Sequence, residues 1–250
     1  MMYPTIWRVK QLRLTFFVAP DIEFDSRGWW AGLTGQPAET RTEQPRLATR
    51  QDAGSILTPP ATLVLNSQPG RVDWILNPRE LGTAEGGDLT TETIGVFEPV
   101  LSEFLELVRP WYDHSPDVIR LALGADLVTE VEGHDAGYEF LGRYLDIPID
   151  PDTKDFLYRI NKPSVSTTLP ATQVNRLTTW SVIVAKHVSV NIGPSSVASS
   201  ETARYHGARL ELDINTSKDR RDFVPASAFG AVVGELRDIA VQLSTTGWKQ

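Results

Sequence analysis

Apolar residues recur at three- and four-residue steps in two long segments of the chain. This spacing places them on one side of a 3.6-residue helix, with acidic and polar residues on the other side. Pro99 fits only the first turn of the first helix and Pro110 ends it, whereas Pro225 fits the start of the second. The pattern predicts helices over residues 97–109 and 225–243. Their apolar stripes consist of Val100, Leu101, Phe104, Leu105, Val108 and Trp111, and of Phe229, Val232, Val233, Leu236, Ile239 and Leu243.

A series of shorter elements precedes each of these helices. In the first half, the pattern predicts a strand at 12–18 and then a short helix that Asp25 or Ser26 caps and Gly35 ends. A weaker strand at 46–50 precedes a hairpin, whose Pro69-Gly70 centre suits a type II turn between Leu63–Leu65 and Val72–Leu76. In the second half, the corresponding elements are a short helix around 138–144 and strands at 118–123, 156–160, 180–190 and 208–214.

Both halves therefore read β-α-β-β-β-α, which indicates an α+β protein. We expect one or two antiparallel sheets with the helices on one face. The two halves would arise by tandem duplication of a β-α-β(3–4)-α unit. Pro60-Ala61-Thr62 and Pro170-Ala171-Thr172 fall at matching places in the two halves. The repeats would span residues 1–116 and 117–250, either as two units or as one continuous domain. The alternative is that an α+β chain of this length offers such a parse by chance.

Composition narrows the class of protein. No run of about 18 apolar residues is present, so a membrane-spanning helix is not expected. The absence of Cys excludes disulfides, thiolate chemistry and Cys-ligated metal. The first residues lack the pattern of a secretory signal, and the predicted compartment is the cytoplasm. No cofactor is predicted.

The net charge of −8 is distributed unevenly along the chain. Residues 1–117 carry −6 and residues 118–250 carry −2, and a Gly- and Thr-rich loop at 77–93 lies in the most acidic stretch. An acidic loop of this length can contact a basic partner or mimic nucleic-acid charge. The candidate binding residues there are Glu80, Glu85, Asp88 and Glu92. The alternative is a solvated loop that keeps the protein soluble.

The search for catalytic chemistry returns one constellation. Phosphate-binding glycine loops, H-E-x-x-H and G-x-S-x-G are all absent. His187 and His206 lie on strands that should pair as an antiparallel hairpin, near its loop and within about one position of being opposite each other. With Glu211 or Asp213 they can bind a metal ion, as in a metal-assisted hydrolase. The register is unknown, however, and a slip of one residue turns one ring to the other face.

Two further groups of residues are candidates for recognition. Lys218, Arg220 and Arg221 form the densest basic cluster, ahead of the last helix, where a phosphate or carboxylate can bind. Asp219 and Asp222 interrupt this cluster and favour a self-neutralised turn. The aromatic residues Trp29, Trp30 and Trp74 could form a recognition surface, but large aromatics in short helices and strands more often belong to the core.

Two resemblances extend this interpretation. The segment Ala208-Arg209-Leu210-Glu211-Leu212-Asp213-Ile214-Asn215-Thr216, with a polar break and a long terminal helix, resembles the end of an uncharacterised, sporadically distributed bacterial family of similar length. It covers about 40 residues and implies no known activity. Separately, the order of elements is similar to that of TATA-binding proteins, without a shared sequence motif. That similarity implies one curved antiparallel sheet shared by two repeats, with the helices on its convex side.

The leading hypothesis is a cytoplasmic, non-enzymatic binding protein whose sheet face or acidic loop engages another protein. A sporadic family would suit accessory bacterial systems of conflict, defence or toxin neutralisation. The alternatives are the hydrolase and a small-ligand site between sheet and helices. The negative net charge disfavours duplex DNA, since the basic residues expected on or beside the sheet are mainly Lys10, Arg13, Lys186 and Arg209.

Overall fold

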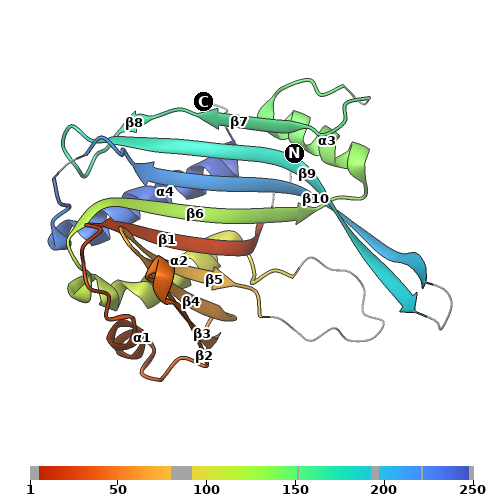
Figure 1. Cartoon of the computed structure of the whole chain (residues 1–250). Coiled ribbons are helices and arrows are strands. Elements are labelled where there is room, and N and C mark those ends of the chain that lie inside the picture. Colours follow the sequence, from red (N-terminus) through yellow and green to blue (C-terminus); the bar gives the residue numbers. More distant parts are fainter. Residues whose placement is uncertain (1–5, 80–91, 151, 193–196, 221, 248–250) are drawn as a thin grey trace.

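The computed structural model describes residues 6–79, 92–150, 152–192, 197–220 and 222–247. The ten strands in these residues form one sheet in the order β2-β3-β4-β5-β1-β6-β10-β9-β7, and β8 also pairs with β9 (Figure 1). Every described strand pair is antiparallel. The strands are β1 (Arg8–Val18), β2 (Thr40–Gln44), β3 (Thr49–Leu57), β4 (Pro60–Gln68), β5 (Arg71–Asn77), β6 (Val118–Glu130), β7 (Leu157–Asn161), β8 (Ser164–Val165), β9 (Gln173–Ile192) and β10 (Val197–Thr216).

The α-helices lie on one face of this sheet, as expected for an α+β fold. They are α1 (Ser26–Thr34), α2 (Phe97–Val108), α3 (His134–Leu145) and α4 (Phe229–Thr246). Figure 1 shows α2 and α4 behind the sheet, and each helix contributes to one buried apolar cluster that includes Trp30, Phe104, Leu141 and Leu236. None of the described α-helices lies on the opposite face, and we call it the open face.

Aromatic side chains fill the core beneath the first half of the sheet. The ring of Phe16 on β1 lies 4.7 Å from that of Trp111, and Trp74 on β5 lies 5.9 Å from the same indole. Trp30 stacks against Trp74 at 6.3 Å. Trp30 and Trp74 are therefore core residues, whereas Trp29 is only partly buried beside them.

The elements with strong local signals form as predicted. Asp25 caps α1 by accepting a hydrogen bond from the Gly28 N–H at 2.9 Å, and Gly35 ends the helix with φ +70°. The predicted helix at 97–109 is α2, and the hairpin of β4 and β5 turns at Gly70, whose φ of +77° suits a type II turn. The predicted helix at 225–243 begins later as an α-helix, because residues 226–228 form a 3₁₀ turn.

The predicted strand at 46–50 is largely wrong, because only Thr49 and Arg50 of these residues belong to a strand, β3. Residues 45–47 form a 3₁₀ turn, and β2 and β3 flank it. Every residue of β2 is exposed, so no buried face imposes an apolar alternation on its sequence. The second half also has an additional strand, since Pro163 separates β7 from β8 along the sheet edge. Each half thus contains five strands, in agreement with the longer form of the predicted β-α-β(3–4)-α unit.

The two halves meet at the centre of the sheet, where β1 pairs with β6. Moving outward from this pair, the first half continues with β5, β4, β3 and β2, and the second half with β10 and β9, to which both β7 and β8 pair. In each half the last strand thus pairs with the first. Beyond the Gly207–Glu130 pair, β10 has only β9 as a described neighbour, and these two strands extend past the sheet as a two-stranded ribbon (Figure 1).

Candidate binding face

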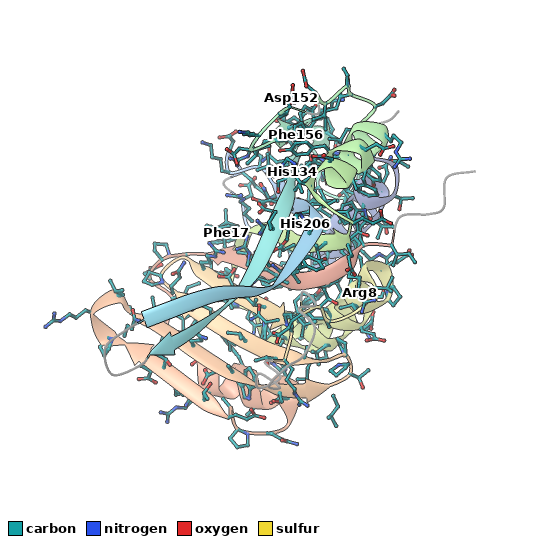
Figure 2. All side chains as sticks on the ribbon, turned by 90° about the vertical axis from the view of Figure 1, so that its right-hand side faces the viewer. Arg8, Phe17, His134, Asp152, Phe156 and His206 are labelled. Atoms are coloured by element: carbon teal, nitrogen blue, oxygen red, sulfur yellow. The ribbon has the colours of Figure 1, made fainter. Side chains whose placement is uncertain are left out.

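Side-chain alternation gives the open face its composition. On β1, Leu12, Leu14 and Phe16 enter the core, so the residues between them point to the other side. The same alternation on β6 and β10 directs Leu121, Leu123, Leu210 and Leu212 inward. Figure 2 shows Phe17 at the left, on the side away from the helices. The central strands therefore present the polar residues Gln11, Arg13, Thr15, Arg120, Asp126, Arg209, Glu211, Asp213 and Asn215 on the open face.

Strand pairing sorts these residues into rows that run across the strands. Arg13 on β1 pairs with Gly124 on β6, and Gly124 pairs with Asp213 on β10. The neighbouring row contains Gln11, Asp126, Glu211, Thr179 and Arg159, from β1, β6, β10, β9 and β7 in turn. Side chains in one row have neighbouring Cβ atoms. The residue two positions further along each strand belongs to the next row. Arginines and carboxylates from five strands consequently share one small area.

A hollow of about 470 Å³ lies over these two rows. The absence of a side chain at Gly124, in the middle of the sheet, helps to form it. A Cβ at Gly124 would lie 3.4 Å and 3.5 Å from Nη2 and Nε of Arg13, so the guanidinium occupies the space over this glycine. The polar lining of the hollow consists of Gln11, Arg13, Asp126, Arg159, Thr179, Arg209, Glu211 and Asp213.

One arginine in the hollow is neutralised within the protein. Arg209 donates from Nε and Nη2 to the two carboxylate oxygens of Asp126, at 2.8 Å each, and its Nη1 lies 2.6 Å from Oε1 of Glu211. The hydrogen bond to Asp126 and the charges of both carboxylates raise the pKa of Arg209, against the effect of partial burial. Such a bidentate pair fixes the guanidinium plane. Arg209 is thus part of the wall of the hollow.

The other two arginines remain available to a ligand. Within the described part of the chain, neither Arg13 nor Arg159 has a hydrogen-bond or ion-pair partner, and the Nε of Arg13 is buried from solvent. Arg159 is exposed on the edge strand β7. A buried donor of a charged group without a partner is costly, because the guanidinium cannot lose its proton. The hollow therefore contains unused capacity to hydrogen-bond an anion.

A second cluster on the open face surrounds Phe17. The guanidinium carbon of Arg120 lies 4.4 Å from the centre of the Phe17 ring, and that of Arg71 lies 5.7 Å away. Burial lowers the pKa of Arg120, and the carboxylate of Asp213 partly offsets this effect. Arg120 also donates to Oδ1 of Asn215 at 2.9 Å. This cluster continues the polar surface of the hollow toward the opposite end of the central strands.

The strand register separates the residues of the predicted metal site. His206 pairs with Val184 and His187 with Ala203, which separates the two residues by three positions, or about 10 Å along the strands. His206 also alternates with the core residues Ala208 and Leu210, so its side of β10 is opposite to that of Glu211 and Asp213.

Among the described residues, no group of three or more His, Cys, Asp or Glu is placed to hold a metal ion. The interpretation of His187, His206, Glu211 and Asp213 as one site is therefore wrong, because the strand register separates its members. Glu211 and Asp213 instead line the hollow on the open face.

Only some residues of the predicted basic and acidic clusters lie in the described part of the chain. Arg220 donates to Oγ1 of Thr172 at 2.9 Å and to the carbonyl oxygen of Phe223 at 3.2 Å, so it holds two loops together, while Lys218 is exposed. Arg221 lies outside the described residues, as do Glu80, Glu85 and Asp88. Glu92 is described and exposed, beside a second hollow that Arg8 and Arg79 also line.

Some residues of the hollow could be anticipated and others could not. Arg13 and Arg209 lie on the sheet, as predicted. Asp126 was missed because β6 extends seven residues beyond the predicted end at Leu123. The signal was present in the alternating small and charged residues Arg120, Ala122, Gly124 and Asp126.

Comparison with known proteins leaves the family open. No family model matches the chain, and neither a curated protein nor a solved structure matches it. Among the helices of the described residues, none combines the length and the hydropathy that crossing a membrane requires. The geometry of the open face is therefore the main basis for a functional argument.

Proposed function

We propose that this chain is a non-enzymatic binding protein that engages another protein through the open face of its sheet. The observation that carries this proposal is Arg13, a charged residue beside a hollow with a buried donor that no described group satisfies. Arg209 beside it is held by ion pairs to Asp126 and Glu211, so this part of the surface is fixed before a partner arrives. Arginine is enriched in protein–protein interfaces, where its planar fork binds carboxylates.

The order of the strands in the sheet supports a second proposal, which concerns the evolutionary origin of the two halves. In each half the first strand pairs with the last, and the two first strands meet at the centre of the sheet. Tandem duplication of one β-α-β(4)-α unit, with repeats at 1–116 and 117–250, accounts for this order. The saddle arrangement implied by the similarity to TATA-binding proteins, and membership of the sporadic bacterial family with an accessory defence role, remain parts of this proposal.

A partner-capture experiment tests the binding function. Tagged wild-type protein is compared with a double variant of the hollow, Arg13→Glu with Arg159→Glu. The matched control is Arg143→Glu with Arg237→Glu, which makes the same charge change on helices, at exposed side chains. Unchanged circular dichroism and thermal midpoint establish that each variant folds.

The proposal expects a stoichiometric protein that wild type and control retain and the hollow variant loses. Nuclease treatment of the lysate should leave this partner bound. Equal recovery from all three proteins would contradict the assignment of the open face, and a partner that disappears with nuclease would identify nucleic acid as the bound material. The combined His187→Ala and His206→Ala variant should not change partner recovery or bound metal.

A further inference from the structure

The hollow contains opposite charges in adjacent rows, and this arrangement restricts what can bind there. Arg13 and Arg159 approach from β1 and β7, which are four strand spacings or roughly 19 Å apart. Asp126, Glu211 and Asp213 lie on the strands between them. A ligand that satisfies both arginines must therefore carry separated anionic groups and also tolerate carboxylates along its length.

Arg13 selects the anionic groups of such a ligand. Its planar guanidinium has a fork of N–H donors that matches a carboxylate or a phosphate. The buried Nε over Gly124 lacks a described partner, so an oxygen that enters the hollow can replace water lost on burial. A charge-assisted, two-point hydrogen bond is the strongest contact available to the fork.

The carboxylates favour a peptide over a polyphosphate. Asp126 and Glu211 are partly neutralised by Arg209, but the described residues contain no ion pair to Asp213, which accepts a hydrogen bond from Nδ2 of Asn215 at 2.9 Å. A phosphodiester backbone has no N–H donor to offer to the free lone pairs of these carboxylates. A peptide instead provides main-chain N–H donors for their free lone pairs and separate side-chain carboxylates for the arginines.

We infer that the hollow binds an extended acidic segment of the partner protein, with one carboxylate on Arg13 and another near Arg159. This inference rests on the proposed function and specifies the chemistry of its partner. The probe is a fluorescein-labelled octaglutamate peptide, and its binding to the full chain is followed by fluorescence anisotropy at low and physiological ionic strength.

Three variants accompany the wild type. Arg13→Gln removes the charged fork, whereas Gly124→Val keeps Arg13 but places methyl groups where its guanidinium lies. The valine suits a strand, so this second variant protects the test against a folding defect. Arg237→Gln is the matched control, because it removes one positive charge from the exposed surface of α4.

The inference expects saturable binding that both hollow variants weaken by about tenfold or more, with Arg237→Gln unchanged. Failure of the wild type to bind octaglutamate, or equal binding by Arg13→Gln and Arg237→Gln, would overturn it. If octathymidylate competes with the labelled peptide as effectively as unlabelled octaglutamate does, the choice of a peptide ligand is wrong. If the captured partner depends on Arg13 but octaglutamate does not bind, the proposed function stands and the acidic ligand is wrong.

Discussion

Glu235 provides a quantitative test of how the second half of the fold is held together. Its carboxylate on α4 accepts hydrogen bonds from Oγ of Ser166 and from the backbone N–H of Thr167, both at 2.7 Å. The Ser166 hydroxyl oxygen also accepts the N–H of Leu169 at 2.9 Å. Because Leu169 is buried, this network ties the loop after β8 to both the helix and the core. Glu235→Gln keeps the shape of the side chain but removes its charge and one acceptor.

The expected loss in the free energy of unfolding follows from these contacts. Charge-assisted hydrogen bonds contribute about 1.5–3 kcal/mol each when fully buried, and partial solvent access at Glu235 reduces this contribution. One acceptor survives in glutamine, so we expect a loss of about 1–1.5 kcal/mol. With an m-value of about 2–3 kcal/mol/M, the midpoint of urea unfolding should fall by roughly 0.5 M.

The pH dependence of this loss separates charge from shape. Burial alone would raise the pKa of Glu235, but hydrogen bonds from Thr167, Ser166 and Thr168 outweigh it and lower the pKa below 4.5. A lowered folded-state pKa means that the unfolded chain binds the proton first as pH falls. The stabilisation is therefore fully present above the unfolded value and is lost as pH falls through the folded value. The wild type and Glu235→Gln should converge in stability under acid.

A neighbouring substitution supplies the control. Asp238→Asn makes the same chemical change three residues later on α4, at an exposed carboxylate that forms an ion pair with exposed Arg237. Its cost should stay below about 0.5 kcal/mol. The reasoning is refuted if Glu235→Gln costs no more than Asp238→Asn, or if its cost is the same at pH values above and well below the pKa.

Three further predictions use the same unfolding assay. Phe104→Ala on α2 removes a fully buried ring and should cost about 3–5 kcal/mol, whereas the adjacent exposed Glu103→Ala should change stability by less than about 0.5 kcal/mol. Gly70→Ala should destabilise by about 1 kcal/mol because its φ is +77°, while Gly234→Ala in α4, where a Cβ meets no atom within 4 Å, should stabilise by up to about 1 kcal/mol. Arg209→Gln leaves the carboxylates of Asp126 and Glu211 directly opposite each other without the cation that pairs with both, so the free energy of unfolding should fall by about 1 kcal/mol at low salt. Added salt screens the repulsion and should reduce this loss, and a loss that salt does not change would contradict the mechanism.

The sequence predicts elements whose signals are local. The Asp25 cap, the Gly35 terminator and the Pro69-Gly70 turn each act within a few residues, so α1 and the β4–β5 hairpin could be located without knowledge of the fold. The exposed strand β2 gives no such signal, because its stability comes from pairing with β3. The prediction of β10 at 208–214 missed its outer part for a related reason, since among the described residues that part pairs only with β9. The prediction of β9 at 180–190 missed residues 173–179, which pair with β7, β8 and β10.

The candidate site depended on information that periodicity does not contain. Alternation along β10 was readable, and it already separates His206 from Glu211 and Asp213 by side. The pairing of β9 with β10 was predicted, but the strand on the other side of β10 was not readable. Arg13 and Asp213 are 200 positions apart in the chain, and they share a row only because β6 lies between β1 and β10. The polar hollow is thus a product of strand order.

Gly124 is the residue that best distinguishes a binding face from an ordinary solvated sheet surface. Its φ is not in the left-handed region, so the backbone of β6 does not require glycine there. Glycine in a strand interior costs about 0.5–1 kcal/mol relative to alanine, and it leaves nothing to pack against neighbouring strands. A surface evolved only for stability would place a β-branched residue at this central position. Instead the vacant space holds the guanidinium of Arg13, whose buried donor is unsatisfied among the described residues. The cost of glycine at position 124 and the cost of the unsatisfied donor of Arg13 thus arise at paired positions. A ligand that hydrogen-bonds Arg13 would offset both.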